Sequence, residues 1–150
     1  MRSYLVVIDE TKEARVALRY AARRAARTGV RIDIVAVVPP PEFVQWRGVQ
    51  EAMEEEARLR AEAMVAQATG AIAEEAGIKP AITVRQGDPV KAVSELLAER
   101  TDIAILVLAA GDQGPGPLMS HFCGAGASSL PCPLVIVPAG LSDEALDRLT

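Results

Sequence analysis

Five short apolar runs alternate with helical stretches, and this alternation constrains the fold more than any other feature of the 150-residue sequence. The runs are rich in Val, Ile and Leu and cover residues 4–8, 31–38, 81–86, 103–109 and 134–137. Short continuous apolar runs bounded by turn residues predict strands that are buried on both faces. Between them, apolar residues recur at spacings of three and four, which predicts amphipathic helices over 12–28, 51–76 and 90–100. Strands that alternate with helices predict an α/β fold around a mainly parallel sheet with right-handed crossovers.

Turn and capping residues predict where these elements begin and end. The expected helix starts and ends are marked by Thr11, Asp88, Ser142, Gly29 and Gly77. Pro89 follows Asp88 at the first helical position, where a proline fits because it needs no backbone N–H. A short final helix follows the fifth apolar run. We therefore expect one domain over 1–150, with a core over 1–140 and a helical tail over 141–150.

Composition and charge argue against several classes of protein. The net charge of −4 argues against a general nucleic-acid binder. No apolar run reaches the roughly 18 residues of a membrane-spanning helix, and the apolar stretch near the N-terminus is too short for a secretory signal. Cys123, Cys132 and the single histidine, His121, have no zinc-site spacing, and we expect both cysteines to be free thiols. The sequence therefore predicts a cytoplasmic protein without metal, membrane or nucleic-acid partners.

Four arginines share one ridge of the first predicted helix. Arg15, Arg19, Arg23 and Arg27 lie four residues apart, so their side chains follow one another along the helix surface. Two interpretations remain open: a solvated charged face, or a surface that binds anions or an acidic partner.

The loop after the fourth predicted strand is rich in glycine. It contains Gly111, Gly114 and Gly116, and glycine allows backbone N–H groups to approach a phosphate closely. Ligands of open parallel α/β sheets bind beyond the carboxyl ends of the strands. Asp9 and Val37 lie at the ends of the first and second strands, so we expect them to share a crevice with this loop.

The chain resembles the universal stress protein family over about 140 residues. The residues that carry the resemblance are LVVIDE (5–10), VRQGDPVKAV (84–93), the strand after Asp102 with its Gly-rich loop, and SLPCPLVIVP (129–138). The resemblance implies a three-layer, Rossmann-like fold of the adenine-nucleotide alpha-hydrolase-like type, with a five-stranded parallel sheet of order 3-2-1-4-5. It also implies a homodimer, often made by pairing the last strands. Many members bind ATP through an Asp, a Val and a G-x2-G-x9-G-[S/T] motif, whereas others have lost the motif and bind no nucleotide.

Two residues match the family pattern directly, and the glycine motif departs from it. Asp9 matches the family Asp and Val37 the family Val. An Asp at a strand end also serves as the cap of the next helix, and this second interpretation of Asp9 remains open. In one register Gly111, Gly114 and Gly124 fit the glycine spacing of the motif, but Ala125 stands where the hydroxyl-bearing residue belongs.

A second register, counted back from Pro131-Cys132-Pro133, places Ser120 near the phosphate-binding serine. It predicts a helix that opens at Ser120, where a hydroxyl and free N–H groups could hold an anion. We prefer this register, because it keeps the last helix–strand connection at its usual length. The predicted binding residues are therefore Asp9, Val37, Gly111, Gly114, Gly116 and Ser120.

The charge of the loop limits what it can bind. No Lys or Arg occurs between Arg100 and Arg148, Asp112 adds a negative charge, and Pro115 and Pro117 remove two N–H donors. Three outcomes remain open: ATP or another adenine nucleotide with or without magnesium, a smaller or different anion, and no nucleotide.

Catalysis has little support in the sequence. A nucleophile needs a base within reach, and the side chains of the neighbours Ser120 and His121 diverge on a helix. We expect a non-enzymatic, homodimeric stress-response protein, at most a very weak nucleotide hydrolase. The alternative is a nucleotide-free dimeric module that acts through protein partners.

Overall fold

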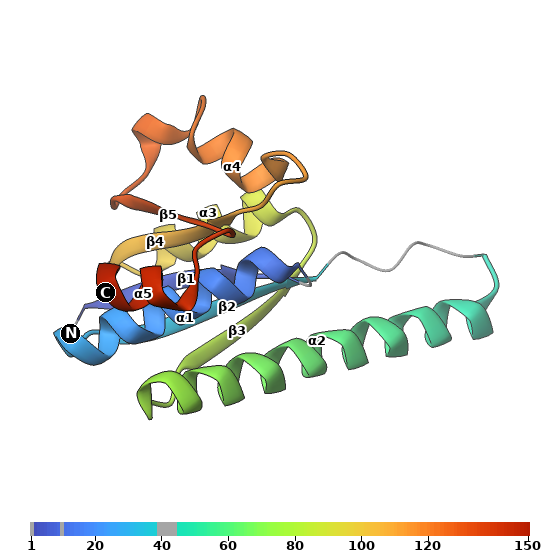
Figure 1. The fold of residues 1–150 in the computed structure, drawn as a ribbon. Helices are drawn as coiled ribbons and strands as arrows, with labels where there is room; N and C mark the ends of the chain where they lie inside the picture. Colours follow the sequence, from blue (N-terminus) through green and yellow to red (C-terminus); the bar gives the residue numbers. More distant parts are fainter. Residues whose placement is uncertain (1, 10, 39–44) are drawn as a thin grey trace.

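The computed structural model covers the 150-residue chain and describes residues 2–9, 11–38 and 45–150. Five parallel strands form one open sheet in the order β3-β2-β1-β4-β5 (Figure 1). Their bounds are β1 (Ser3–Ile8), β2 (Arg31–Val38), β3 (Ala81–Gln86), β4 (Ile103–Ala110) and β5 (Leu134–Pro138). The α/β class and the strand order 3-2-1-4-5 expected from the sequence are confirmed. All six residues of β1 are buried, as expected of a central strand covered on both faces.

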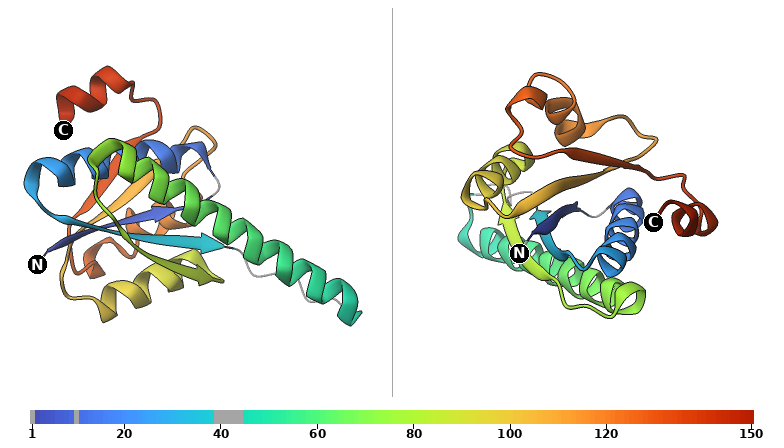
Figure 2. Two further views of the ribbon diagram at one scale, coloured as in Figure 1. Left: turned by 90° about the horizontal axis from the view of Figure 1, so that it is seen from below. Right: turned by 90° about the vertical axis from the view of Figure 1, so that its left-hand side faces the viewer.

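Helices cover both faces of the sheet and make a three-layer structure, which the two views of Figure 2 show. The helices are α1 (Lys12–Thr28), α2 (Arg47–Ala76), α3 (Pro89–Glu99), α4 (Gly116–Phe122) and α5 (Asp143–Leu149), with a 3-10 turn over Ala127–Ser129. Apolar residues of α1 and α2 pack with one face of the sheet, and those of α3 and α4 pack with the other. None of the described helices combines the length and the apolarity needed to cross a bilayer.

Several helix ends follow the predicted capping chemistry. The Asp88 side chain accepts a hydrogen bond from Val90 N at 3.3 Å, and Ser142 Oγ accepts one from Ala145 N at 3.1 Å. Gly29 ends α1 with a φ of 74°, a left-handed conformation that glycine adopts without strain. Thr11 stands at the N-cap position of α1, but its side chain makes no capping hydrogen bond.

The start of α2 differs from the prediction. The helix begins at Arg47 rather than Glu51, so it has one further turn. Trp46 precedes this turn and is 75% exposed, so it does not pack onto the body of the protein. The buried residues of α2 begin only at Ala57, because its N-terminal part extends past the end of the sheet (Figures 1 and 2).

A polar network closes the amino end of the sheet. Asp33 on β2 is buried, and its carboxylate accepts hydrogen bonds from Ser3 Oγ and from Arg100 Nη1 and Nη2, the last two at 3.3 and 3.0 Å. Arg100 also donates to Asp102 at 2.8 Å, and Arg31 reaches Asp102 at 2.9 Å. The hydrogen bond from Arg100 holds the pKa of Asp102 well below its usual range. The network is therefore a structural feature at the edge opposite the predicted crevice.

Candidate functional site

A crevice opens at the carboxyl ends of β1, β2 and β4, where the topology predicts a ligand site. Its volume is about 420 Å³, within the range of small-molecule sites in proteins. Five of the six predicted binding residues line it, namely Asp9, Val37, Gly111, Gly114 and Gly116. The parallel order of the strands explains this convergence, because Asp9 follows β1, Val37 is the last but one residue of β2 and Gly111 follows β4. The further apolar lining residues include Val7, Leu108, Leu118 and Met119.

Ser120 is the predicted residue that does not line the crevice. The helix expected to open at Ser120 instead begins at Gly116, so this prediction was wrong and Ser120 lies well inside α4 with an exposed side chain. The physical reason is Pro117, because its fixed φ and missing N–H suit the first turn of a helix. Gly124, the third glycine of the other register, also lies outside the lining. A Cβ at Gly124 would come within 2.6 Å of Ser120 O, so this glycine permits the tight end of α4.

Asp9 anchors the turn from β1 into α1. Its Oδ1 accepts a hydrogen bond from Thr11 N at 2.9 Å and a second one from Thr11 Oγ1. Thr11 is itself the N-cap residue of α1, so Asp9 fixes the turn before the helix and does not cap the helix. Because Asp9 also lines the crevice, the same carboxylate is placed where a ligand hydroxyl could donate to it.

A different structural feature accounts for glycine at different positions of the loop. Gly114 and Gly116 have φ values of 97° and 67°, conformations that other residues rarely adopt, and a Cβ added at either would meet no atom within 4 Å. Gly111 has no such φ, but a Cβ added there would overlap the Cγ, Cδ and Oε1 atoms of Glu13. Gly111 therefore makes room for a glutamate from the first turn of α1.

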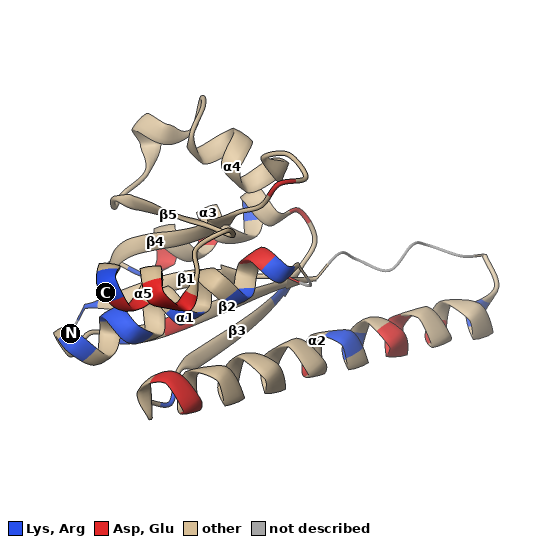
Figure 3. Cartoon of the chain, in the orientation of Figure 1, with Lys and Arg blue, Asp and Glu red and all other residues tan. Residues whose placement is uncertain are grey.

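Glu13 is the charged residue of the crevice lining that the sequence analysis did not predict. It lines the crevice together with Asp9, and none of the described lining residues is Lys or Arg. Lys12, its neighbour in the first turn of α1, does not line the crevice, and the segment from β4 to β5 carries no basic residue (Figure 3). One signal was present in the sequence: the first turn of a helix that directly follows β1 must lie at the same edge of the sheet as the crevice.

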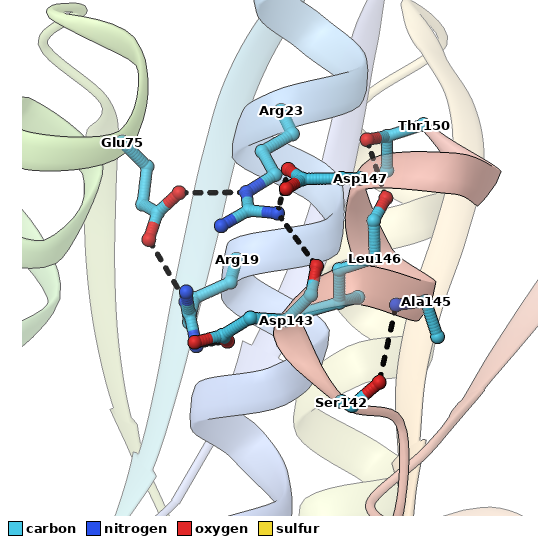
Figure 4. Close-up of polar contacts among 9 residues, drawn as sticks. All are labelled: Arg19, Arg23, Glu75, Ser142, Asp143, Ala145, Leu146, Asp147 and Thr150. Carbon is cyan, nitrogen blue, oxygen red and sulfur yellow. Dashed lines mark hydrogen bonds and ion pairs between the residues drawn. The ribbon is translucent and has the colours of Figure 1, made fainter.

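The arginine ridge of α1 contacts carboxylates of this same chain. Arg19 Nε and Arg23 Nε donate to the two oxygens of Glu75 on α2, each at 2.8 Å (Figure 4). Arg19 also pairs with Asp143, and Arg23 with Asp147, both on α5. The hydrogen bond from Arg23 is the largest of the influences that lower the pKa of Glu75. The two central arginines of the ridge therefore join α1, α2 and α5.

A larger cavity of about 600 Å³ lies between α1 and α2. It shares Asp9, Thr11 and Ala14 with the crevice, but Val37 and the glycines of the loop after β4 do not line it. Val37 and the three glycines predicted to bind a ligand therefore line only the smaller crevice, which is the candidate site.

His121, Cys123 and Cys132 lie outside the crevice. The His121 ring packs against Gly126 and meets the Phe122 ring edge-on at 4.9 Å. Both cysteines are free; Cys123 is exposed, and burial raises the pKa of the Cys132 thiol. Among the described residues, no group of three His, Cys, Asp or Glu side chains is placed to hold a metal ion.

The three-layer sheet of order 3-2-1-4-5, with a crevice beyond its carboxyl edge, defines an open Rossmann-like α/β protein. The family model described as "Universal stress protein family" matches residues 1–138. The chain therefore belongs to the universal stress protein family, and α5 lies beyond the matched residues.

Solved structures share this fold at low sequence identity. Universal stress protein UspA from Lactobacillus plantarum aligns with a TM-score of 0.71 at 17% identity, over 91% of this chain and 97% of that one. A family protein from Arabidopsis thaliana with AMP bound gives 0.60 at 13%, over 96% and 95%. The universal stress protein from Archaeoglobus fulgidus in complex with dAMP gives 0.57 at 16%, over 91% and 97%. A search of curated proteins by sequence gave no significant match.

Proposed function

We propose that this chain is a non-enzymatic stress-response protein that binds an adenine nucleotide in the crevice at the carboxyl ends of β1, β2 and β4. The observation that carries the proposal is the convergence of Asp9, Val37 and the glycine loop on one cavity of about 420 Å³. Its apolar lining suits the faces of a purine base, and the Asp9 carboxylate suits ribose hydroxyls, which are hydrogen-bond donors. The complexes of two fold relatives with AMP and dAMP support the same ligand class.

Isothermal titration calorimetry with AMP, ADP and ATP, each with and without magnesium, tests this proposal. The Asp9→Ala variant should weaken binding about tenfold, because it removes an acceptor for the ligand hydroxyls. Asp112→Ala is the matched control, since it also removes a negative charge near the loop but does not line the crevice. Absence of heat at millimolar concentrations of all three nucleotides would contradict the proposal, as would equal losses in the two variants.

A nucleotide-free dimeric module that acts through protein partners is the second candidate. The observation that favours it is the contact between Glu13 and Gly111, which places a carboxylate of the chain itself against the glycine loop. Mass spectrometry of the purified protein separates the two candidates. A co-purified adenine nucleotide supports the first, and a ligand-free protein that also fails the calorimetric test supports the second.

The setting proposed for the protein is a homodimer in the cytoplasm. Free Cys123 and Cys132 suit a reducing compartment. β5 is an edge strand that pairs only with β4 among the described strands, so its outer edge offers backbone groups to a second copy.

A further inference from the structure

We propose that Glu13 sets the ligand selectivity of the crevice, so that it takes adenosine or its monophosphate and rejects ADP and ATP. This inference rests on the proposed function, because it names the class of adenine ligand that the same site takes. Glu13 is a specificity-determining residue in this proposal: its carboxylate repels the outer phosphates.

The position of Glu13 carries the first step. A crevice of this type can attract an anion through two features of its backbone, the N-terminus of a helix and the N–H groups of a glycine loop. In this protein the same side chain, that of Glu13, lies beside both features. Glu13 lies in the first turn of the 17-residue helix α1, and its side chain packs where a Cβ of residue 111 would be. The Glu13 carboxylate therefore lies where the helix N-terminus and the glycine loop would attract a phosphate most strongly.

The glycines give the second step. Gly114 and Gly116 have positive φ values that favour glycine, and the Glu13 side chain fills the space that a Cβ of residue 111 would take. Each of the three is thus explained by the conformation and packing of the chain itself. Glycine-rich loops bind phosphates because a residue without a side chain lets the ligand approach the backbone closely. At Gly111 the Glu13 side chain takes that space.

The charge of the lining gives the third step. Asp9 and Glu13 are both acidic, and the described lining residues include no Lys or Arg to offset them. Asp112 adds an exposed carboxylate on the same loop. Each phosphate added to adenosine brings more negative charge towards these groups, and a partly enclosed site weakens the screening by water. Affinity should therefore fall from adenosine to AMP, ADP and ATP.

The rest of the crevice favours the nucleoside part of the ligand. Val7, Val37 and Leu108 come from three adjacent strands and form an apolar lining for a base. Asp9 lies beside them and can accept hydrogen bonds from ribose hydroxyls. Most of the attraction thus acts on base and sugar, and the repulsion acts on the phosphates, which gives selectivity by charge.

The experiment is calorimetry of the full chain with adenosine, AMP, ADP and ATP, each in EDTA and in magnesium. Glu13→Gln keeps the shape of the side chain against Gly111 and removes its charge. We expect this variant to bind ATP about tenfold more tightly than the wild type, while its affinity for adenosine changes less than about twofold. Glu95→Gln on α3 is the matched control, because Glu95 is exposed and lies outside the crevice lining. Thermal unfolding of both variants verifies that they are folded.

The outcomes separate this inference from the proposed function. Wild-type protein that binds ATP as tightly as adenosine, in either buffer, overturns the role of Glu13 and leaves nucleotide binding intact. An equal change for all ligands in Glu13→Gln, or the same change in Glu95→Gln, also overturns that role. A wild type that binds none of the four ligands, together with a Glu13→Gln variant that binds ATP, supports the role of Glu13 and overturns the proposed function of the wild type. No binding by either protein overturns both.

Discussion

At the scale of single residues, Arg100 and Asp33 form a charged pair in which the carboxylate is buried. Asp33 is 7% exposed, and two of its three hydrogen-bond donors belong to Arg100. Arg100→Leu would leave a buried carboxylate with Ser3 as its one remaining neutral partner. Because Arg100 is itself about one-third exposed, we expect a loss of about 1–3 kcal/mol in the free energy of unfolding.

Urea denaturation followed by circular dichroism measures this loss. Arg24→Leu is the control, because it makes the same substitution at an exposed position of α1. If both variants lose the same stability, the network around Asp33 has no special role.

The sequence predicts the positions of some site residues but not of others. Asp9, Val37 and Gly111 could be brought to one crevice from chain order alone, because parallel strands end at the same edge of a sheet. The contact of Glu13 with Gly111 could not, since it joins residues that are distant in the sequence. Which side chain of the first turn of α1 faces the loop is decided by packing, and no local pattern encodes it.

At the scale of elements, α5 is held against α1 by the paired arginines. Arg19 and Arg23 reach Asp143 and Asp147 on α5 as well as Glu75 on α2. The pKa of Glu75 is lowered in the folded protein, chiefly by the hydrogen bond from Arg23. A lowered carboxyl pKa gives stability that is present above the unfolded pKa, about 4.5, and is lost as the pH falls through the folded value.

The double variant Arg19→Gln/Arg23→Gln tests the direction of this pH dependence of stability. It should lower the free energy of unfolding by about 1 kcal/mol at pH 7, because the contacts are half-buried. The difference from the wild type should shrink as the pH falls below 4, where the carboxylates of the wild type also become protonated. Arg24→Gln/Arg27→Gln, on an exposed part of the same helix, is the control. A difference that stays constant from pH 7 to pH 3 would show that the charges of this cluster do not stabilise the fold.

The elements that sequence reasoning placed well have strong local signals. Asp88 with Pro89, and Ser142 before two acidic residues, marked the starts of α3 and α5 correctly. The start of α2 was missed because Trp46 precedes it without a side-chain capping hydrogen bond. The start of α4 was misplaced because Pro117, which offers no N–H donor to a ligand, also suits the first turn of a helix.

At the scale of the whole molecule, the outer edge of β5 predicts how two copies would pair. Pro133 O accepts from Leu106 N at 3.0 Å, and Ala139 N donates to Ala110 O at 2.8 Å, so odd-numbered residues of this segment bond to β4. The backbone of Ile136 therefore faces away from β4, and its side chain is 40% exposed. A second copy that pairs along this edge would use the N–H of Ile136.

Ile136→Pro removes this one donor without affecting the ladder to β4, because an edge strand accepts proline where the N–H faces solvent. We expect the dissociation constant of the homodimer to rise more than about tenfold, as measured by sedimentation velocity over a dilution series. Ile136→Thr is the control, since it keeps the backbone donor and the β-branched shape, and it should change the constant much less. A wild-type protein that is monomeric at all concentrations, or an Ile136→Pro variant that dimerises as the wild type does, would exclude pairing through this edge. In that case two copies, if they associate, must use a surface in which the backbone of β5 takes no part.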